Sequence, residues 1–248
     1  MKALITGGSS GIGRDMAIYL SKLGYDVILV SKDENKLKSV SKSIKGSSYY
    51  VCDISSKEEC IRLYNKVKSE NIELLINNAG FGKFGEFNEI NLEDELNMID
   101  VNIKGVHILT KLFLNDFIKR DSGYILNVAS SAAFEPGPLM ATYYSTKAYV
   151  LRLTTSIYEE LRRKKSNVHI SVFCPGPVRT NFNNVANVKF EIKSISSDYA
   201  AKYAIDKMFK NKLVIIPTFY MKGLVFLTRL TPTKLLARIA YNIQNKKR

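Results

Sequence analysis

A glycine-rich turn directly follows the first apolar segment of the chain. Residues 3–6 are Ala-Leu-Ile-Thr, and the next seven residues are Gly7-Gly8-Ser9-Ser10-Gly11-Ile12-Gly13. Glycines permit a tight turn and let the backbone approach a pyrophosphate, which the N-terminus of the following helix can bind. The spacing is G-x-x-x-G-x-G and differs from the general dinucleotide fingerprint. The turn therefore indicates a nucleotide site, with an ordinary glycine-rich strand–helix loop as the alternative.

Apolar runs that suit buried strands alternate with longer segments of helical periodicity. The runs cover residues 3–6, 27–30, 49–52, 74–77, 124–129, 170–174 and 213–216. The helical segments cover residues 13–23, 34–44, 57–70, 91–119, 142–164 and 197–209. Repeated strand–helix units predict parallel strands with crossover helices on both faces of the sheet. We therefore predict an α/β fold, a doubly wound, Rossmann-like parallel sheet of about seven strands with a C-terminal helical tail.

Positive charge is concentrated at the C-terminal end of the chain. The sequence has 37 Lys and Arg against 23 Asp and Glu, a net charge of +14. The last acid is Asp206, and residues 207–248 contain ten basic residues, so the first 206 residues carry a net charge of only +4. We predict one domain over residues 1–217, with residues 218–248 as a basic amphipathic extension of it. The body has no basic groove interleaved with aromatic residues, so we expect no nucleic acid partner.

Cellular location and metal content are also constrained. The chain opens on a strand-like segment instead of an apolar leader, and no window offers ~18 uninterrupted apolar residues. Cys52, Cys60 and Cys174 lack metal or redox spacing, and His107 and His169 lack partner ligands. We therefore expect free thiols, no metal site and a cytoplasmic protein.

Three further motifs follow the glycine turn. They are Asn77-Asn78-Ala79-Gly80 after the fourth predicted strand, Tyr143-Tyr144-Ser145-Thr146-Lys147 in a predicted helix, and Pro175-Gly176 after the sixth predicted strand. Together with the turn, they resemble the short-chain dehydrogenase/reductase family over residues 1 to about 217. The resemblance implies hydride transfer between a nicotinamide cofactor and a carbonyl/alcohol pair.

Tyr143 and Lys147 are the candidate catalytic pair. They stand four residues apart and share one face of a helix. A lysine ammonium close to a phenol favours the phenolate, so we expect the pKa of Tyr143 to lie below ~10 and the phenol to exchange a proton with substrate. The resemblance implies that Lys147 also holds the nicotinamide ribose. Without the other motifs such a pair is more often a surface pair, and Tyr144 is a rival whose spacing to Lys147 does not fit.

The resemblance supplies two more catalytic candidates, Ser130 and Asn102. Ser130 lies thirteen residues before Tyr143, at the end of a predicted strand. Its hydroxyl would stabilise charge on the substrate oxygen, and Ser131 is the neighbouring alternative. The resemblance gives Asn102 a part in a water relay to the lysine, and asparagine is locally unfavourable inside a helix.

The end of the second predicted strand indicates which nicotinamide cofactor binds. A site for NAD would place an acid there, whereas this chain has Ser31 followed by Lys32. A hydroxyl and an ammonium suit a 2′-phosphate, and the resemblance also links a basic residue here with NADP(H). We predict NADP(H), with NAD(H) less favoured. Asp33 is the alternative, because a shift of two positions would restore an acid.

The resemblance places further cofactor contacts at the strand ends. It implies that Asp53 contacts the adenine, that Asn77 and its neighbours line the ribose side, and that Val178 and Thr180 contact the carboxamide. The complete predicted cofactor set is Gly7, Ser9, Ser10, Gly11, Ile12, Gly13, Ser31, Lys32, Asp53, Asn78, Ala79, Gly80, Tyr143, Lys147, Pro175, Gly176, Val178 and Thr180.

The segment after Pro175-Gly176 is expected to cover the substrate. Residues 181–196 are rich in apolar side chains, which favours an apolar or lipid-like carbonyl compound, with packing of the loop itself as the alternative role of these side chains. The apolar candidates for the substrate wall are Phe81, Phe84, Phe134, Phe182, Val185, Val188 and Phe190.

The tail and the oligomeric state leave alternatives open. Thr231-Pro232 is interpreted as a helix N-cap followed by proline, before an apolar stripe of Leu235, Leu236, Ile239 and Ile243. The stripe indicates a helix docked over the substrate cleft, a dimer contact or a weak contact with a membrane surface, in which case the protein is peripheral to a membrane. The long predicted helices favour a homodimer or homotetramer. A non-catalytic nucleotide-binding sensor or scaffold is the alternative function.

Overall fold

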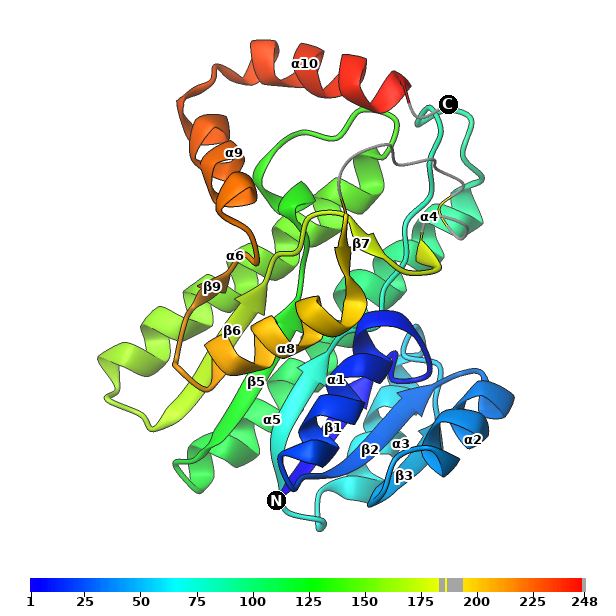
Figure 1. Cartoon of the computed structure of the whole chain (residues 1–248), viewed down its shortest axis with the longest axis vertical. Coiled ribbons are helices and arrows are strands. Elements are labelled where there is room, and N and C mark those ends of the chain that lie inside the picture. The colour runs from blue at the N-terminus through cyan, green and yellow to red at the C-terminus, as the bar shows by residue number, and fades with distance from the viewer. Residues whose placement is uncertain (183–185, 187–193, 247–248) are drawn as a thin grey trace.

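Seven parallel strands form one sheet through the centre of the molecule (Figure 1). The computed structural model describes residues 1–182, 186 and 194–246. The order of the strands is β3-β2-β1-β4-β5-β6-β9, and each pairs in parallel with its neighbours. They are β1 (Lys2–Thr6), β2 (Asp26–Ser31), β3 (Ser47–Val51), β4 (Ile72–Asn77), β5 (Gly123–Val128), β6 (Val168–Phe173) and β9 (Val214–Ile215). Each strand overlaps one predicted apolar run, so the predicted doubly wound sheet is confirmed.

Helices cover both faces of the sheet. One face is covered by α1 (Gly11–Lys22), α2 (Glu34–Lys42) and α8 (Ser197–Met208), and the other by α3 (Lys57–Val67), α5 (Val106–Lys119) and α6 (Ala141–Arg163). The residues of β1 show why the strands are apolar throughout. Ala3 and Ile5 pack with the first group of helices, whereas Leu4 packs with the second. A strand buried on both sides needs apolar residues at every position.

The order of the strands reverses beside β1. The chain first builds β2 and β3 on one side of β1 and then crosses to place β4 on the other side. The last residues of β1 and β4, Thr6 and Asn77, pair in register. In open α/β sheets, the crevice at the carboxyl ends of two such strands is where ligands bind. The glycine turn and the Asn77-Asn78-Ala79-Gly80 motif both begin at this point.

The predicted helix over residues 91–119 is interrupted in the structure. It consists of α4 (Leu92–Ile99), a π-helical turn η1 (Asp100–Gly105) and α5. A Cβ on Gly105 would lie 2.5 Å from the carbonyl oxygen of Ile54, so glycine lets this turn pass close to the segment after β3. Single π-helical turns inside α-helices are frequent at functional sites. This one contains Asn102, whose side chain is fully buried.

Three short elements had no counterpart in the predictions. They are the 3₁₀ turn η2 (Ser131–Phe134) and the strands β7 (Val178–Arg179) and β8 (Ile195–Ser196), which pair with each other in parallel. The strand pair holds the segment after Pro175-Gly176 against residues that precede α8. Elements of two to four residues are too short to leave a periodic pattern in the sequence.

The last two helices form an arm beyond the sheet layers (Figure 1). In this C-terminal arm (residues 219–245), α9 (Phe219–Leu230) rises from the end of β9 and α10 (Thr233–Asn245) runs across the top of the view. Thr231 is not the N-cap of α10, because its hydroxyl donates to the carbonyl of Leu227 at 2.9 Å and so closes α9. Pro232 occupies the cap position instead. The division of the chain at residue 217, between β9 and α9, stays a prediction.

No helix among the described residues is both long and apolar enough to span a bilayer.

Candidate active site

A cavity of about 770 Å³ lies at the carboxyl ends of the strands. Its walls come from the glycine turn, the ends of β2, β4, β5 and β6, the start of α6 and the C-terminal arm. Ser130 and nearly all of the predicted cofactor residues line it: Gly7, Ser9, Ser10, Gly11, Ile12, Ser31, Lys32, Asp53, Asn78, Ala79, Gly80, Tyr143, Lys147, Pro175, Gly176, Val178 and Thr180. Gly13 and Asn102 lie behind the wall and support it.

The glycine turn points the N-terminus of α1 at this cavity. Gly7 and Gly11 have positive φ angles of 65° and 52°, which only glycine adopts without strain. Within the described part of the chain, α2 and α3 are capped by the side chains of Asp33 and Ser56, whereas the Ser10 side chain makes no cap hydrogen bond to α1. The backbone N–H groups of the first turn of α1 are therefore placed to receive an anion.

Gly13 serves packing and does not line the cavity, contrary to its predicted role as a cofactor contact. A Cβ on Gly13 would lie 2.4 Å from both the carbonyl oxygen of Gly7 and Nδ2 of Asn78. Any side chain at position 13 would push α1 away from the turn. The third glycine of the motif therefore sets the distance between the helix and the turn.

Thr6 joins the glycine turn to the motif after β4. Its hydroxyl oxygen accepts hydrogen bonds from the N–H groups of Asn78 and Ala79, at 3.1 and 3.2 Å. The Asn78 amide in turn donates to the carbonyls of Thr6 and Gly7, at 3.2 and 3.3 Å. Asn78 therefore lines the cavity while its amide group holds the glycine turn in place.

Asn77 does not line the cavity, contrary to the expectation. It is 1% exposed, and its Nδ2 donates to Oδ1 of Asn127 at 2.9 Å and to Oγ1 of Thr110 at 3.0 Å. Asn127 donates onward to Thr154 of α6 at 3.0 Å. This buried polar chain ties β4 and β5 to α5 and α6 below the cavity.

Ser31 and Lys32 form the cavity wall at the end of β2. The Ser9 hydroxyl donates to that of Ser31 at 3.0 Å and links this wall to the glycine turn. Asp33 faces α2 instead, where its carboxylate accepts the N–H of Lys36 at 3.0 Å and pairs with the Lys36 ammonium at 2.8 Å. These contacts lower the pKa of Asp33 below its usual value. The acid considered as an alternative at this strand end is therefore used as a helix cap.

Asp53 lies across the cavity wall from Lys32. Burial by itself would raise the pKa of Asp53, but hydrogen bonds from the backbone and hydroxyl of Ser55, together with the Lys32 charge, bring it below the usual value. Oδ1 of Asp53 accepts from Ser55 N and Oγ at 3.0 and 2.8 Å. The carboxylate is therefore ionised and held in a fixed orientation near Lys32.

The end of β5 and the start of α6 bring three predicted catalytic residues together. Nζ of Lys147 donates to the carbonyl oxygen of Val128, the last residue of β5, at 3.1 Å and lies 5.8 Å from the centre of the Tyr143 ring. The Ser130 side chain hydrogen-bonds with the Tyr143 phenol. Ser130 Oγ also accepts the N–H of Ala132 at 3.2 Å, which fixes its rotamer.

The pKa values of the pair differ from the expectation. Burial raises the pKa of Tyr143 to about 12, although the hydrogen bond with Ser130 acts in the opposite direction. Burial also lowers the pKa of Lys147 to about 8, with the buried Cys174 thiol acting in the opposite direction. The expected lowering of the pKa of Tyr143 by the Lys147 charge is therefore wrong for this structure. Desolvation is the largest cause of both shifts, because each group is buried in the protein.

Asn102 holds the segment that follows the Asn77-Asn78-Ala79-Gly80 motif. Its Oδ1 accepts the N–H of Phe81 at 3.1 Å, and its Nδ2 donates to the Phe81 carbonyl at 2.9 Å and to Oγ1 of Thr146 at 3.0 Å. A Cβ on Gly80 would lie 2.9 Å from Oδ1 of Asn102 and 3.1 Å from Nζ of Lys147. The side chain of Asn102 is thus committed to the backbone of Phe81, and the expected water relay stays a prediction.

Aromatic residues surround the phenol of Tyr143. The Phe182 ring centre lies 5.4 Å from that of Tyr143, and Phe81 and Phe182 both line the cavity. Phe84 packs beside this pair, and Phe134 packs with Met221 of α9. Val185, Val188 and Phe190, also expected at this wall, lie outside the described residues.

The C-terminal arm closes the far side of the cavity. The apolar residues of the arm that line it are Tyr220, Met221, Leu224, Val225 and Leu227 of α9 with Leu236, Ile239, Ala240 and Ile243 of α10. Three members of the predicted α10 stripe thus face the cavity, in agreement with a helix docked over the cleft. The contribution of α9 escaped the sequence analysis because its apolar residues occur on nearly every side of the helix.

Tyr144 ties α10 to the helix that carries Tyr143. Gln244 of α10 is 3% exposed, and its Nε2 donates a hydrogen bond to the Tyr144 hydroxyl. A Cβ on Gly137 would lie 2.0 Å from the Tyr144 ring, so glycine leaves the room that this ring fills. Tyr144 was considered only as a rival to Tyr143. The signal for its role lies in Gln244, a polar residue within the otherwise apolar inner face of α10.

The residues present fit a nicotinamide dinucleotide. The uncapped N-terminus of α1 suits the pyrophosphate, the Gly7 and Gly11 conformations allow close backbone approach, and Asp53 with Lys32 offers polar contacts at the β2 and β3 ends. Tyr143, Ser130 and Lys147 stand at the other end of the same cavity. This arrangement can bring a bound carbonyl oxygen within reach of two hydroxyl groups.

Comparisons with known proteins agree with this geometry. Residues 1–189 match the family described as short chain dehydrogenase. An uncharacterized oxidoreductase of Staphylococcus saprophyticus is 33% identical over 216 residues, covering 83% of this chain and 91% of the relative. A 3-oxoacyl-[acyl-carrier-protein] reductase of Rickettsia prowazekii is 31% identical over 188 residues, covering 75% of this chain and 76% of the relative.

Solved structures share the fold. A short-chain dehydrogenase from Sphingobium yanoikuyae in complex with NADPH has a TM-score of 0.83 at 24% identity, covering 92% of this chain and 93% of the other. One from Burkholderia phymatum in complex with NAD has a TM-score of 0.84 at 23% identity, covering 91% and 92%.

Proposed function

The chain belongs to the short-chain dehydrogenase family, and on that basis we propose that it is an NADP(H)-dependent oxidoreductase acting on an apolar carbonyl/alcohol pair. The observation that carries the proposal is the convergence of Ser130, Tyr143 and Lys147 on the wall of a cavity whose other end is the uncapped N-terminus of α1. A scaffold that only bound a nucleotide would need the uncapped N-terminus of α1 but not the grouping of Ser130, Tyr143 and Lys147.

Tyr143 acts as the general acid in the direction of reduction. Its raised pKa keeps the phenol protonated at neutral pH, so the phenol can donate a hydrogen bond and then a proton to a carbonyl oxygen. When bound, the reduced nicotinamide supplies the hydride. The Ser130 hydroxyl, already bonded to the phenol, holds the substrate oxygen beside it and stabilises the charge that develops there.

Lys147 supports the phenol through its charge. Its pKa of about 8 leaves the ammonium protonated at neutral pH, and the hydrogen bond to Val128 fixes Nζ beside the cavity. A positive charge at this place stabilises the phenolate that remains after Tyr143 gives up its proton. It would also bind a ribose hydroxyl of the cofactor.

The cofactor preference is proposed from the end of β2. Ser31 and Lys32 line the cavity, whereas the Asp33 carboxylate is held by Lys36 on α2. An ammonium group at this position attracts the 2′-phosphate of NADP(H). The Asp33 carboxylate is occupied by Lys36 and so does not accept a hydrogen bond from the 2′-hydroxyl of NAD(H). Steady-state turnover with NADPH and NADH tests this, and higher kcat/KM with NADH would contradict it.

The substrate class is proposed from the walls contributed by the C-terminal arm. The space next to Tyr143 is surrounded by Phe81, Phe182 and the apolar residues of α9 and α10 that line the cavity. This lining favours an extended apolar carbonyl compound over a sugar. A panel of ketones and 3-oxoacyl thioesters of increasing chain length tests it. We expect kcat/KM to rise with chain length, and a preference for small polar ketones would contradict the proposal.

We also propose a cytoplasmic homodimer or homotetramer. Leu92, Leu96 and Ile99 stand on one side of α4 and are 64%, 44% and 38% exposed. Apolar side chains at this spacing form a stripe that suits packing against a second copy. Sedimentation velocity on the full chain tests the assembly, and a monomer at all concentrations would contradict it.

A further inference from the structure

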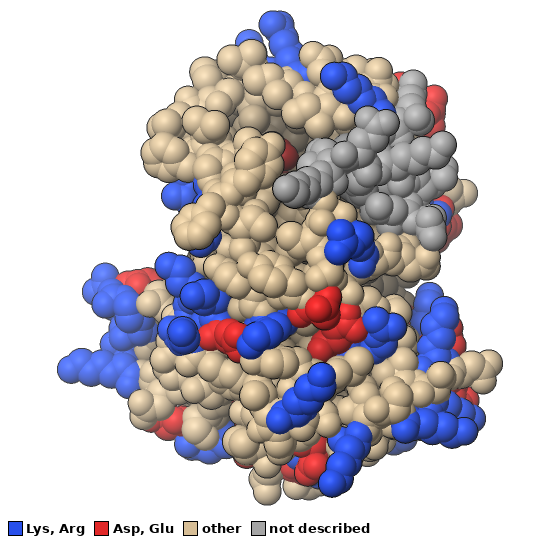
Figure 2. Space-filling model, in the orientation of Figure 1, with Lys and Arg blue, Asp and Glu red and all other residues tan. Residues whose placement is uncertain are grey.

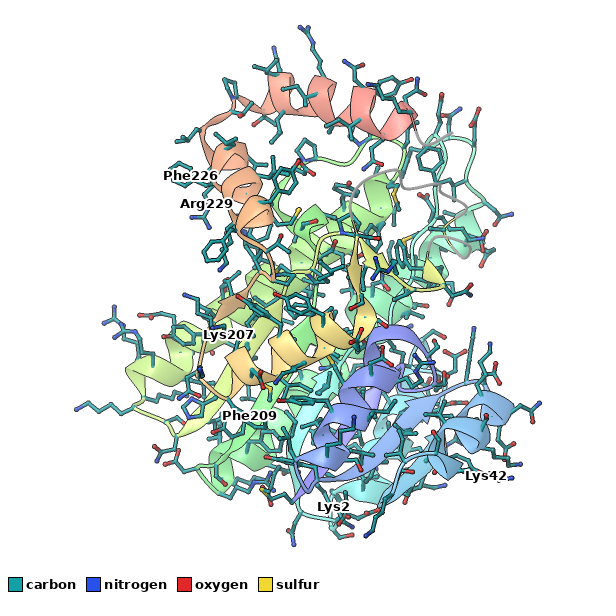
Figure 3. All side chains as sticks on the ribbon, viewed as in Figure 1. Lys2, Lys42, Lys207, Phe209, Phe226 and Arg229 are labelled. Atoms are coloured by element: carbon teal, nitrogen blue, oxygen red, sulfur yellow. The ribbon has the colours of Figure 1, made fainter. Side chains whose placement is uncertain are left out.

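The outer side of α9 is an apolar stripe that is largely exposed. Phe219, Phe226 and Leu230 are 88%, 60% and 68% exposed, and none of them lines the cavity. Their spacing of seven and four residues puts them on one side of the helix. Figure 3 shows Phe226 projecting outward from α9, away from α10. Two phenylalanines and a leucine exposed on one side of a helix are unusual for a soluble surface.

Basic side chains border this stripe. Lys222 and Arg229 are exposed next to it, and Nζ of Lys222 lies 4.6 Å from the centre of the Phe219 ring. Figure 3 shows Arg229 beside Phe226 on the same side of α9. The sequence after Asp206 contains no acid. In Figure 2 the surface over α9 is largely uncharged with blue at its margin, whereas the body below mixes red and blue.

In α10 the apolar residues that line the cavity and the basic residues lie on opposite sides of the helix. Leu236, Ile239 and Ile243 face the cavity, and Lys234 and Arg238 are exposed on the opposite side. These three apolar residues of α10 are thus used within the protein, whereas Leu235 and Tyr241 are 50% and 40% exposed beside its basic residues. The outward surface of the C-terminal arm therefore combines the apolar stripe of α9 with basic groups from both helices.

The charge of this surface selects its partner. In a two-fold symmetric dimer the same patch meets itself, so Lys222 and Arg229 of one copy would face the same cations of the other without an acid nearby to offset them. An anionic lipid surface offers the opposite charge together with an apolar layer beneath it. Aromatic and leucine side chains flanked by lysine and arginine are what an interfacial helix needs.

We propose that the outer side of α9, through Phe219, Phe226, Leu230, Lys222 and Arg229, docks the protein on an anionic bilayer. At 12 residues α9 is ~18 Å long, well short of a ~30 Å hydrocarbon core, so it lies in the plane of the interface. The opposite side of the same helix, including Met221 and Leu224, lines the cavity. Docking therefore places the apolar end of the cavity next to the lipid.

Co-sedimentation of the full chain with vesicles tests this docking. The probes are phosphatidylcholine vesicles with and without phosphatidylserine, at low and high salt. We expect binding to vesicles that contain phosphatidylserine, weakened by salt. The double variant Phe219→Asn/Phe226→Asn should bind at least tenfold more weakly, and Lys222→Gln/Arg229→Gln should lose about fivefold for each charge removed.

Matched variants control for general effects. Phe87 is 66% exposed, close to the 60% of Phe226, and lies on the body outside the cavity lining, so Phe87→Asn should bind as the wild type does. Lys42→Gln/Lys45→Gln removes two exposed cations and should also leave binding unchanged, because Lys42 lies at the opposite end of the molecule from α9 (Figure 3) and Lys45 follows it before β3. Circular dichroism and NADPH titration verify that every variant is folded.

Three outcomes would overturn the proposal. The first is wild-type protein that stays in solution with phosphatidylserine vesicles. The second is equal binding by the wild type and the Phe219→Asn/Phe226→Asn variant. The third is a concentration-dependent dimer in sedimentation velocity that this variant abolishes while vesicle binding is absent, which would make the stripe a contact between copies. Because the readout is binding, catalytic inactivity would leave the result intact and would count only against the proposed function.

Discussion

Nζ of Lys147 donates a hydrogen bond of 3.1 Å to the carbonyl oxygen of Val128, two residues before Ser130. The same strand end therefore positions the ammonium of α6 and the hydroxyl that bonds to Tyr143. Because Lys147 is 5% exposed, its charge is costly to keep and burial lowers its pKa to about 8. This relationship makes the charge state of the site sensitive to pH just above neutrality.

The first prediction concerns this pH dependence. As pH rises, Lys147 loses its proton near pH 8, whereas Tyr143, with a pKa of about 12, keeps its proton far longer. We expect kcat/KM for carbonyl reduction to be level below pH 8 and to fall above it, since kcat/KM reports the free enzyme. Lys147→Met should lower kcat/KM at least ~100-fold and remove the break. A break near pH 8 that persists in Lys147→Met would contradict the assignment.

The second prediction concerns the hydrogen bond between Gln244 and Tyr144. Removing it with Tyr144→Phe loosens α10 over the cavity and leaves the cofactor end untouched. A hydrogen bond is worth ~1 kcal/mol, so we expect KM for apolar ketones to rise about fivefold with NADPH affinity unchanged. Tyr241→Phe, at a 40% exposed position of α10, is the matched control. Equal KM values in both variants would mean that the hydrogen bond between Gln244 and Tyr144 does not hold α10 over the substrate.

The third prediction concerns Asn102. Asn102→Ala removes three hydrogen bonds, two partly buried ones to the Phe81 backbone and one buried one to the Thr146 hydroxyl. Each unsatisfied buried group costs ~1–3 kcal/mol, so we expect the free energy of unfolding to fall by about 3 kcal/mol in urea denaturation. The exposed Asn65→Ala should change it little. A similar small change in both variants would show that Asn102 does not hold this segment.

The fourth prediction compares two glycines. A Cβ at Gly13 meets backbone oxygen of Gly7 at 2.4 Å, whereas a Cβ at Gly223 on α9 meets nothing within 4 Å. Gly13→Ala should displace α1 from the turn, lower stability by ~1–3 kcal/mol and weaken NADPH binding. Gly223→Ala should be neutral or raise stability by up to ~1 kcal/mol, because alanine favours helix. Thermal unfolding and NADPH titration measure both effects, and equal behaviour of the two variants would contradict the packing role of Gly13.

The fifth prediction concerns Lys32. Lys32→Ala removes the ammonium from the β2 end of the cavity, so we expect KM for NADPH to rise about tenfold or more while KM for NADH stays the same. Lys45→Ala, an exposed lysine away from the cavity, should leave both values unchanged. An equal rise in KM for both cofactors would indicate that Lys32 does not contact the 2′-phosphate.

Much of the sheet and the site could be predicted because local patterns determine them. Strands buried on both faces require unbroken apolar runs, and the Tyr143-x-x-x-Lys147 spacing puts two side chains on one helix face. The π-helical turn around Asn102 could not be foreseen, because it depends on close packing between Gly105 and Ile54. The pKa of Tyr143 was predicted in the wrong direction, because the local sequence does not show how deeply other elements bury the phenol, and burial raises its pKa.

The two helices of the C-terminal arm differ in how far the sequence predicts their packing. In α10, the one-sided apolar stripe predicted a docked helix, a dimer contact or a membrane contact, and three of its residues line the cavity. In α9, apolar residues occupy both the inner side and the outer stripe, so no single periodic face marks the helix. Thr231 was misassigned because a threonine before proline suits a helix start, whereas here its hydroxyl bonds back to Leu227.

The central claim is that Tyr143 supplies the proton in NADPH-dependent carbonyl reduction. The most direct measurement is single-turnover oxidation of bound NADPH by an apolar ketone, in wild type and Tyr143→Phe at equal NADPH occupancy. The account predicts that Tyr143→Phe binds NADPH normally and reacts at least ~100-fold more slowly. Equal rates in the two proteins, or wild-type protein that binds NADPH and oxidises it with no ketone of the panel, would contradict it.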